Sequence, residues 1–206
     1  MTMIINYPTF FKTRPTIKLQ DPLQKFLGTF QDGIIEFSYL EIAKNAGHSC
    51  PDVTGAYLMT LKALKALYTD ELPLRGGIKV SFNKDYTDDI TSVMADVVSH
   101  ITGATLSLGF RGVEGQYQRT NLLEFNVPFE GNIKFERVDN GKSVTLKYDL
   151  SSIPIDPKQN MLMAKVLTGE ATLGEEIDFE VIWQHRVERI FNHASELIEF
   201  VKVEEK

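Results

Sequence analysis

The feature that most restricts the fold of this chain is a long helix, predicted from Pro51 to about Tyr68. Cys50 stands at its N-cap position, and Pro51 occupies the favoured first-turn position. Apolar residues recur on one side of the helix, at positions 53, 57, 61, 64 and 68. With 206 residues, 43% of them hydrophobic, the chain is long enough to bury one sizeable core.

Other helices are expected where a capping residue precedes an apolar pattern. Asp21 followed by Pro22 begins one that Asp32-Gly33 ends, Ser38 caps a second through Ala43, and Asp88 opens a third to His100. The third carries its apolar residues at positions 90, 93, 94, 97 and 101. Pro157 begins a further helix, and Thr172 with Glu175 forms a capping box for a last one, expected to reach past residue 195.

Strands are predicted at residues 78–82, 120–127, 132–138 and 143–150, which are rich in β-branched and aromatic residues. Asp139-Asn140-Gly141 predicts a hairpin between the last two. Helices and hairpin-connected strands stand in separate runs along the chain. The expected fold is therefore α+β, a single domain over residues 1–206 with a mostly antiparallel sheet packed by helices.

Composition and charge exclude several classes of function. The net charge is -6, and the basic residues are scattered, which argues against binding to nucleic acid or to anionic lipid. One cysteine allows no intrachain disulfide, no iron–sulfur cluster held by one chain and no paired Cys-x-x-Cys zinc finger. The N-terminus has no apolar run long enough for a signal peptide, and no run of about 18 apolar residues occurs anywhere. We therefore expect a cytoplasmic protein without a membrane span.

The segment before the long helix combines the only cysteine with one of four histidines. A thiol at a helix N-terminus lies in the positive field of the helix dipole, which favours the thiolate, although Asp52 opposes that effect. His48 is near enough in sequence to bind the same metal ion as Cys50, or to take the proton of the thiol. The alternative is that Cys50 is a small buried hydrophobic residue beside a hydrogen-bonded histidine.

Two further places carry candidate site residues. Asp96 and His100 stand at positions i and i+4 of one helix, so the carboxylate can orient the histidine beside a metal or form a simple ion pair with it. Arg119 is expected on a strand, on the same face as Asn121, Leu123 and Phe125. There it can bind a carboxylate or phosphate, or form a salt bridge.

The segment AGHSCPDVTGAYLMTLKAL, residues 46–64, resembles the opening motif of the formylmethanofuran dehydrogenase E-subunit-like family: a His-x-Cys-Pro pair, then a glycine and a long helix. The second family landmark, an acidic residue shortly before a Thr-Gly-Cys-Thr turn, corresponds to Asp96 and to Thr102-Gly103-Ala104-Thr105, followed by Gly109. The resemblance covers about residues 35–125.

The resemblance implies an α+β core that forms an intertwined homodimer, with a metal-binding pocket near the His-x-Cys pair. Two departures from the family pattern stand out. Ala104 replaces the second cysteine of the family, and the C-terminal zinc finger of some members is missing because no cysteine follows Cys50. The family name does not carry an activity over to this chain.

Three hypotheses of function follow. In the first, a homodimer binds a divalent metal through His48 and Cys50, with Asp96, His100, the partner copy or a small molecule completing an open shell. Zinc suits a thiolate and an imidazole, and nickel, iron and copper are alternatives. In the second, Cys50 is the nucleophile of a metal-free thiol enzyme, with His48 or His100 as its base. In the third, the protein is a non-catalytic dimeric binding module with an inert cysteine.

Overall fold

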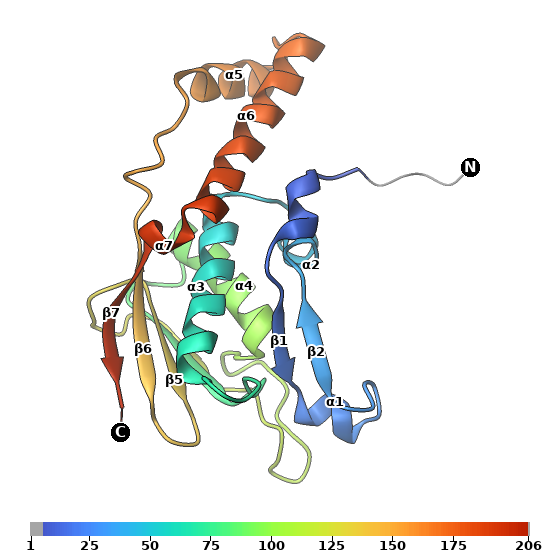
Figure 1. Ribbon diagram of the computed structural model, residues 1–206, viewed down its shortest axis with the longest axis vertical. Coiled ribbons are helices and arrows are strands. Elements are labelled where there is room, and N and C mark those ends of the chain that lie inside the picture. The colour runs from blue at the N-terminus through green and yellow to red at the C-terminus, as the bar shows by residue number, and fades with distance from the viewer. Residues whose placement is uncertain (1–5, 206) are drawn as a thin grey trace.

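Helix α3 (Pro51–Leu67) occupies the middle of the fold in the computed structural model, which describes residues 6–205 (Figure 1). It packs against a sheet on one side and contacts helices α2 (Tyr39–Ala46) and α4 (Asp89–Thr102). The predicted helix is confirmed to within one residue at its C-terminal end. Every residue from Val53 to Thr60 is buried, so α3 is covered on nearly all sides along these two turns.

The larger sheet has five strands in the spatial order β4-β3-β5-β6-β7. Their bounds are Ile78–Phe82 for β3, Leu123–Glu124 for β4, Ile133–Arg137 for β5, Ser143–Tyr148 for β6 and Ile198–Glu204 for β7. Strand β4 pairs with β3 in parallel, and the other pairs are antiparallel. The predicted hairpin joins β5 and β6, where Gly141 adopts a φ of 71° that favours glycine. The predicted fold class, α+β with a mostly antiparallel sheet, is confirmed.

A second, two-stranded sheet lies on the other side of α3 (Figure 1). It pairs β1 (Ile17–Gln20) with β2 (Ile34–Phe37) in antiparallel fashion. A 3-10 helix, Thr9–Thr13, precedes β1, and the short helix α1 (Pro22–Phe26) follows it. Asp21 caps α1 as predicted, because its carboxylate accepts hydrogen bonds from the backbone N–H groups of Leu23 and Gln24.

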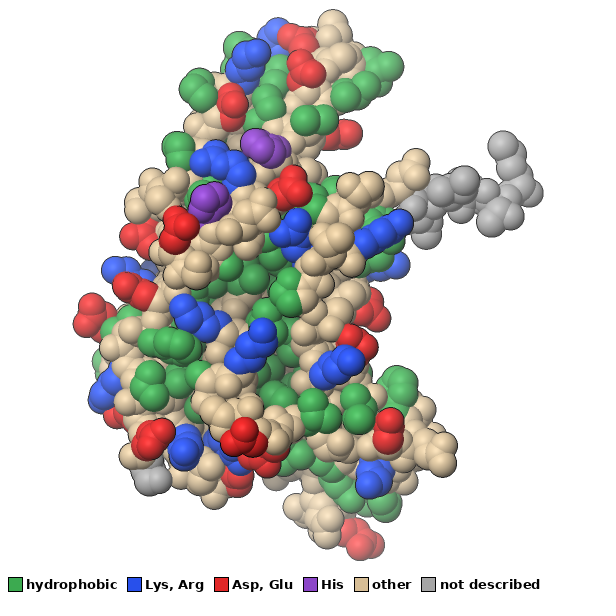
Figure 2. Space-filling model, viewed as in Figure 1, with side chains coloured by type: hydrophobic (Ala, Val, Ile, Leu, Met, Phe, Trp, Pro, Cys, Tyr) green, Lys and Arg blue, Asp and Glu red, His purple; other side chains and the backbone are tan. Residues whose placement is uncertain are grey.

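Two helices near the C-terminus form an arm that projects from the body of the protein, at the top of Figure 1. These are α5 (Pro157–Thr168) and α6 (Leu173–Asn192), and we call residues 157–192 the α5–α6 arm. The predicted capping box of Thr172 and Glu175 is present at the start of α6. The base of α6 is buried at Val187 and Ile190, whereas its first three turns project with apolar side chains exposed, as Figure 2 shows for this face.

The structure corrects several sequence-based expectations. The last helix ends at Asn192 and does not pass residue 195; a short helix α7 (Ala194–Leu197) and strand β7 follow, because β7 gains backbone hydrogen bonds along β6. The strand predicted at 120–127 shrinks to the two residues of β4, because Asn121 and Asn126 adopt positive φ angles on either side of it. Ile90 is 49% exposed and does not belong to the buried stripe of α4. Within residues 6–205, no helix combines the length and apolarity that a membrane crossing requires.

Candidate functional site

The head of α3, which we define as residues 47–54, is held in place by side chains from other elements. The Tyr39 hydroxyl on α2 lies 2.8 Å from Ser49 Oγ and 2.7 Å from Thr54 Oγ1. From α6, the Trp183 indole N–H donates a 2.8 Å hydrogen bond to the Ser49 carbonyl. These buried and half-buried contacts fix the turn that joins α2 to α3, so its side chains have defined directions.

Strand β6 supplies the third support. The Tyr148 hydroxyl donates a 2.9 Å hydrogen bond to the Pro51 carbonyl. The ring reaches this position only because residue 55 is glycine: a Cβ atom there would lie 2.3 Å from Tyr148 Cε1. Gly55 in the family-like segment is therefore a packing requirement for the tyrosine that braces the helix head.

Cys50 caps α3, and its Sγ accepts a 3.4 Å hydrogen bond from the Val53 backbone N–H. The side chain is buried, with 7% of the residue exposed. Burial raises the pKa of the thiol; the backbone N–H groups of Val53 and Asp52 oppose this rise, and the Asp52 charge adds to it. Burial thus outweighs the helix-end effect, and the neutral thiol is favoured at neutral pH.

His48 and Asp52 flank the cysteine. His48 is exposed, and its Nδ1 donates to the Ala46 carbonyl 3.0 Å away, since a carbonyl only accepts; Nε2 is then the nitrogen with a free lone pair. Burial raises the pKa of the half-buried Asp52 carboxyl, and the charges of Arg186 and His48 partly offset it. Asp52 therefore holds a proton more readily than an exposed aspartate does.

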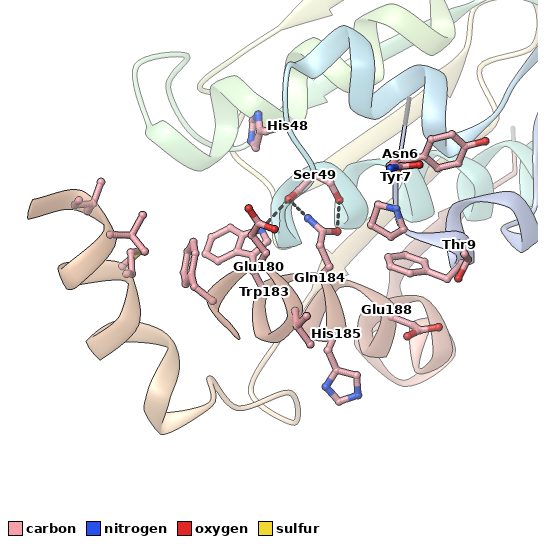
Figure 3. A pocket seen from close by; sticks show the side chains of 17 residues that line it. Asn6, Tyr7, Thr9, His48, Ser49, Glu180, Trp183, Gln184, His185 and Glu188 are labelled. Carbon is pink, nitrogen blue, oxygen red and sulfur yellow. Dashed lines mark hydrogen bonds between the residues drawn. The ribbon is translucent and has the colours of Figure 1, made fainter. Parts of the chain in front are cut away.

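A groove of about 1040 Å³ opens beside the head of α3 (Figure 3). His48 and Ser49 line it from the α3 side, and Trp183 and Gln184 line it from α6. Most of its wall is apolar, with Met163, Val166 and Leu167 of α5, Phe179 and Val181 of α6, and Tyr7 and Phe10 of the N-terminal segment. A large, mostly apolar groove with a few polar groups is the usual form of a small-molecule site.

The other predicted site residues lie away from this groove. Asp96 is exposed on α4, and within residues 6–205 no hydrogen bond or ion pair joins it to His100. The His100 ring packs edge-on against Phe37, with ring centroids 5.3 Å apart. Burial and the charge of Arg75 lower the pKa of His100, so the ring is neutral at neutral pH. Neither residue belongs to the described lining of the groove.

Arg119 is buried, and it does not lie on a strand. Its Nη2 donates a 2.6 Å hydrogen bond to Asp21 Oδ1, across 98 residues of sequence. The salt-bridge alternative for Arg119 is therefore the arrangement that the fold contains. Its partner, the capping aspartate of α1, was not visible from sequence spacing.

The ligand set for a metal is small. In the part of the chain that the structure describes, no three His, Cys, Asp or Glu side chains come together in a group able to hold a metal ion. At the head of α3, one chain offers His48 Nε2, Cys50 Sγ and the Asp52 carboxylate, but these three do not form such a group. Because a catalytic zinc site uses three protein ligands, one chain by itself does not fit such a site.

Sequence reasoning missed several residues that surround the helix head. Trp183 lies in the helix expected after Thr172, and no feature of the sequence marks it as part of a groove wall. Tyr148 lies inside the strand predicted at 143–150, and Arg186 follows two residues after Gln184 on α6. The Arg186 Nε is buried and has no hydrogen-bond partner among residues 6–205. A buried donor of this kind is costly unless something accepts from it.

Comparisons with known proteins give no name to this site. No protein-family model matches the chain, and no curated protein has a significantly similar sequence. The resemblance of residues 35–125 to the formylmethanofuran dehydrogenase E-subunit-like family stays a prediction.

Proposed function

We propose that this protein is a homodimeric metal-binding protein whose groove receives a small molecule beside a divalent ion, most simply zinc, held by His48 and Cys50. The observation that carries the proposal is the groove itself, because His48 and Ser49 line it and the next residue is Cys50. Cys50 is buried at the helix head, just outside the described lining. A metal there would act as a Lewis acid toward a bound molecule. The family resemblance, which implies a pocket near the His-x-Cys pair, points the same way.

The metal requires further ligands, because His48 and Cys50 supply one nitrogen and one sulfur. The remaining ligands would come from a partner copy or from the small molecule itself. The buried Cys50 thiol must lose its proton to bind, so its raised pKa makes metal affinity increase with pH. Trp183 and Gln184 position the turn that carries both ligands through their hydrogen bonds to Ser49.

The α5–α6 arm supports the homodimer. Its exposed apolar residues have no covering element within the described chain: Met161 is 53% exposed, Leu167 79%, Leu173 73%, Ile177 50% and Val181 62%. Residues 173, 177 and 181 form a continuous stripe on α6, spaced one turn apart. Apolar stripes of this size mark protein interfaces.

Charge favours a second copy of the same chain as the covering partner. The outer half of α6 is acidic, with Glu175, Glu176, Asp178 and Glu180. The base of α6 carries Arg186 and Arg189, and the adjoining N-terminal segment carries Lys12. Arg14 of that segment is paired with Glu188 of the base at 3.5 Å, so the unpaired charge there remains positive. If two arms pack antiparallel about a two-fold axis, each acidic tip meets the basic base of the other copy. The second arm then narrows the groove to a chamber near His48.

Metal content tests the first part of the proposal. We expect elemental analysis of tag-free protein to find near-stoichiometric divalent metal, and the His48→Ala and Cys50→Ala variants to lose it. The matched control is His193→Ala, because His193 is a half-exposed histidine outside the groove lining whose Nδ1 lies 3.3 Å from the Glu196 carboxylate. Wild-type protein that is metal-free and takes up none from a panel of divalent ions would refute the metal site. Rapid alkylation of Cys50 near neutral pH would then favour the thiol enzyme, and slow alkylation the binding module.

The mass in solution tests the dimer. Light scattering after size exclusion should give twice the 23.3 kDa of one chain. The Ile177→Glu/Val181→Glu variant places charges on the stripe and should weaken dimerisation by about tenfold or more, since like charges across a buried two-fold contact cost several kcal/mol. Leu108→Glu, which alters a residue that is 91% exposed outside the arm, should leave the dimer intact. A wild-type protein that is monomeric at high concentration contradicts this part of the proposal.

A further inference from the structure

A second cavity, of about 250 Å³, is lined in part by Pro22 and Leu23 of α1. Helix α1 lies at the end of the fold opposite the arm (Figure 1). The described linings of this cavity and of the groove have no residue in common. Two arginines, Arg75 and Arg119, line it together with Gln116 and Tyr117, and its described lining includes no acidic side chain. Two guanidinium groups in one cavity wall need negative charges nearby to balance them.

One buried carboxylate balances only one of the two charges. Asp21 has no exposed surface, and Arg75 Nη1 and Arg119 Nη2 donate to its two oxygens at 3.1 and 2.6 Å. Burial alone would raise the pKa of Asp21, but the hydrogen bonds from Arg119 and Gln24 and the Arg119 charge outweigh it and lower the pKa. Asp21 is therefore ionised at neutral pH, and one positive charge is left over in the cavity wall.

The two arginines differ in how many donors they have left. All three side-chain nitrogens of Arg75 are used: Nε donates to the Ile101 carbonyl, Nη2 to the His100 carbonyl and Nη1 to Asp21. For Arg119, only Nη2 donates to a residue in the described range 6–205. Yet the Arg119 side chain is only 10% exposed. Its remaining N–H groups are thus the free donors of the cavity.

The backbone around Arg119 is built to hold that side chain. The Arg119 carbonyl accepts from the backbone N–H and the hydroxyl of Thr105, and its N–H donates to the Phe110 carbonyl. A Cβ atom at position 103 would lie 2.8 Å from Arg119 Nη1, so the glycine leaves room for the guanidinium. Tyr117, which also lines the cavity, has a φ of 61°, a conformation uncommon for a bulky residue. The segment from Gly103 to Phe110 thus packs against Arg119.

We infer that this cavity binds a small anion, a carboxylate or a phosphate group, through the free N–H donors of Arg119, with Arg75 adding its charge from behind. A planar guanidinium donates two parallel hydrogen bonds to either oxyanion. The bound anion would neutralise the remaining positive charge and relieve the repulsion between the two arginines. That repulsion is evident at Arg75, whose pKa is lowered by burial and by the charge of Arg119.

Calorimetric titration of the full chain tests this inference, with inorganic phosphate in one arm and acetate in the other, in a chloride buffer without other oxyanions. We expect saturable binding of at least one anion. Arg119→Gln should weaken it by about tenfold or more, the loss expected when one charge-assisted hydrogen bond is removed. The anion affinity of Arg119→Lys should lie between those of the wild type and Arg119→Gln. Lysine keeps the positive charge but cannot donate two parallel hydrogen bonds. The exposed Arg111 lies outside the described lining of the cavity, so Arg111→Gln should bind as the wild type does.

A second variant keeps the test decisive if Arg119→Gln does not fold. Gln116 is exposed at the rim of the cavity, and Gln116→Glu adds a negative charge there without touching the Asp21 pairs. We expect weaker anion binding by Gln116→Glu and unchanged binding by Asn160→Asp, which adds the same charge on the exposed surface of α5. Absence of saturable binding of both anions to the wild-type protein, or equal binding by Gln116→Glu and the wild type, would overturn the inference.

Discussion

Replacing Asp21 with asparagine will lower the free energy of unfolding by about 3–5 kcal/mol at neutral pH, the usual cost of breaking a buried ion pair from one side. Asparagine is as good a helix N-cap as aspartate, so the bonds from the Leu23 and Gln24 N–H groups can persist. The substitution therefore isolates the charge, leaving Arg75 and Arg119 buried without a counter-ion. Urea denaturation followed by circular dichroism measures the difference.

The pH dependence identifies the carboxylate as the cause. The pKa of Asp21 is lower in the folded protein than the value of about 3.9 expected in the unfolded chain. Its contribution to stability is thus fully present above that unfolded value and is lost as the pH falls through the lower, folded one. The difference in free energy of unfolding between the wild type and Asp21→Asn should decrease below about pH 4. Glu199→Gln, which breaks an exposed pair with Lys147, should stay within about 0.5 kcal/mol of the wild type. A cost for Asp21→Asn below about 1 kcal/mol would contradict the argument.

Gly55→Ala will destabilise the protein by about 1–2 kcal/mol, although alanine is the better helix former. In an open helix position this change gains about 0.5–1 kcal/mol. At position 55 the new Cβ would lie 2.3–2.8 Å from three atoms of the Tyr148 ring, which is anchored through its hydroxyl to Pro51. Overpacking of this kind costs about 1–3 kcal/mol. Thermal and urea unfolding measure the net effect.

Two matched variants show that the clash is the cause. Gly174 lies in the first turn of α6, where the nearest atom to an added Cβ is 4.0 Å away, so Gly174→Ala should be neutral or stabilising. In a Tyr148→Leu background, Gly55→Ala should lose most of its cost, because the ring is absent. If Gly55→Ala costs the same in both backgrounds, Tyr148 is not the group that requires the glycine.

Local signals in the sequence predicted where the helices begin better than where they end. The helix that begins after Asp21 was expected to run to Asp32-Gly33 but ends at Phe26. Asp21, Ser38, Asp88 and Thr172 all cap helices where expected, because a cap depends on residues only a few positions away. Strands β1, β2 and β7 were missed because their pairing depends on distant residues. The last helix was expected to continue past residue 195 because the apolar spacing there is compatible with a helix. The chain forms β7 instead, because it pairs with the edge of β6.

The candidate site was also predicted only where local sequence signals were sufficient. His48 and Cys50 were predicted beside a helix head, and that head lies at the end of the largest described groove. The burial that raises the pKa of Cys50 was not predictable, since it comes from the packing of the whole fold around the helix. Arg119 was expected on a strand face, but its partner Asp21 lies 98 residues earlier in the chain. The spacing of residues along the chain predicts contacts between near neighbours only, so it gives no sign of a pair this far apart.

The hydrogen bond from Trp183 to the Ser49 carbonyl links the arm directly to the helix head. Trp183 moves with the arm, and Ser49 lies between His48 and Cys50. If docking a second copy shifts the arm, the affinity of the groove for its ligand changes by some factor. Reciprocity then requires that the ligand change the affinity of the two copies by the same factor. Ligand binding in the groove would therefore change the dimerisation constant. A ligand can then be sought by measuring how candidate molecules change the affinity between two copies of the chain.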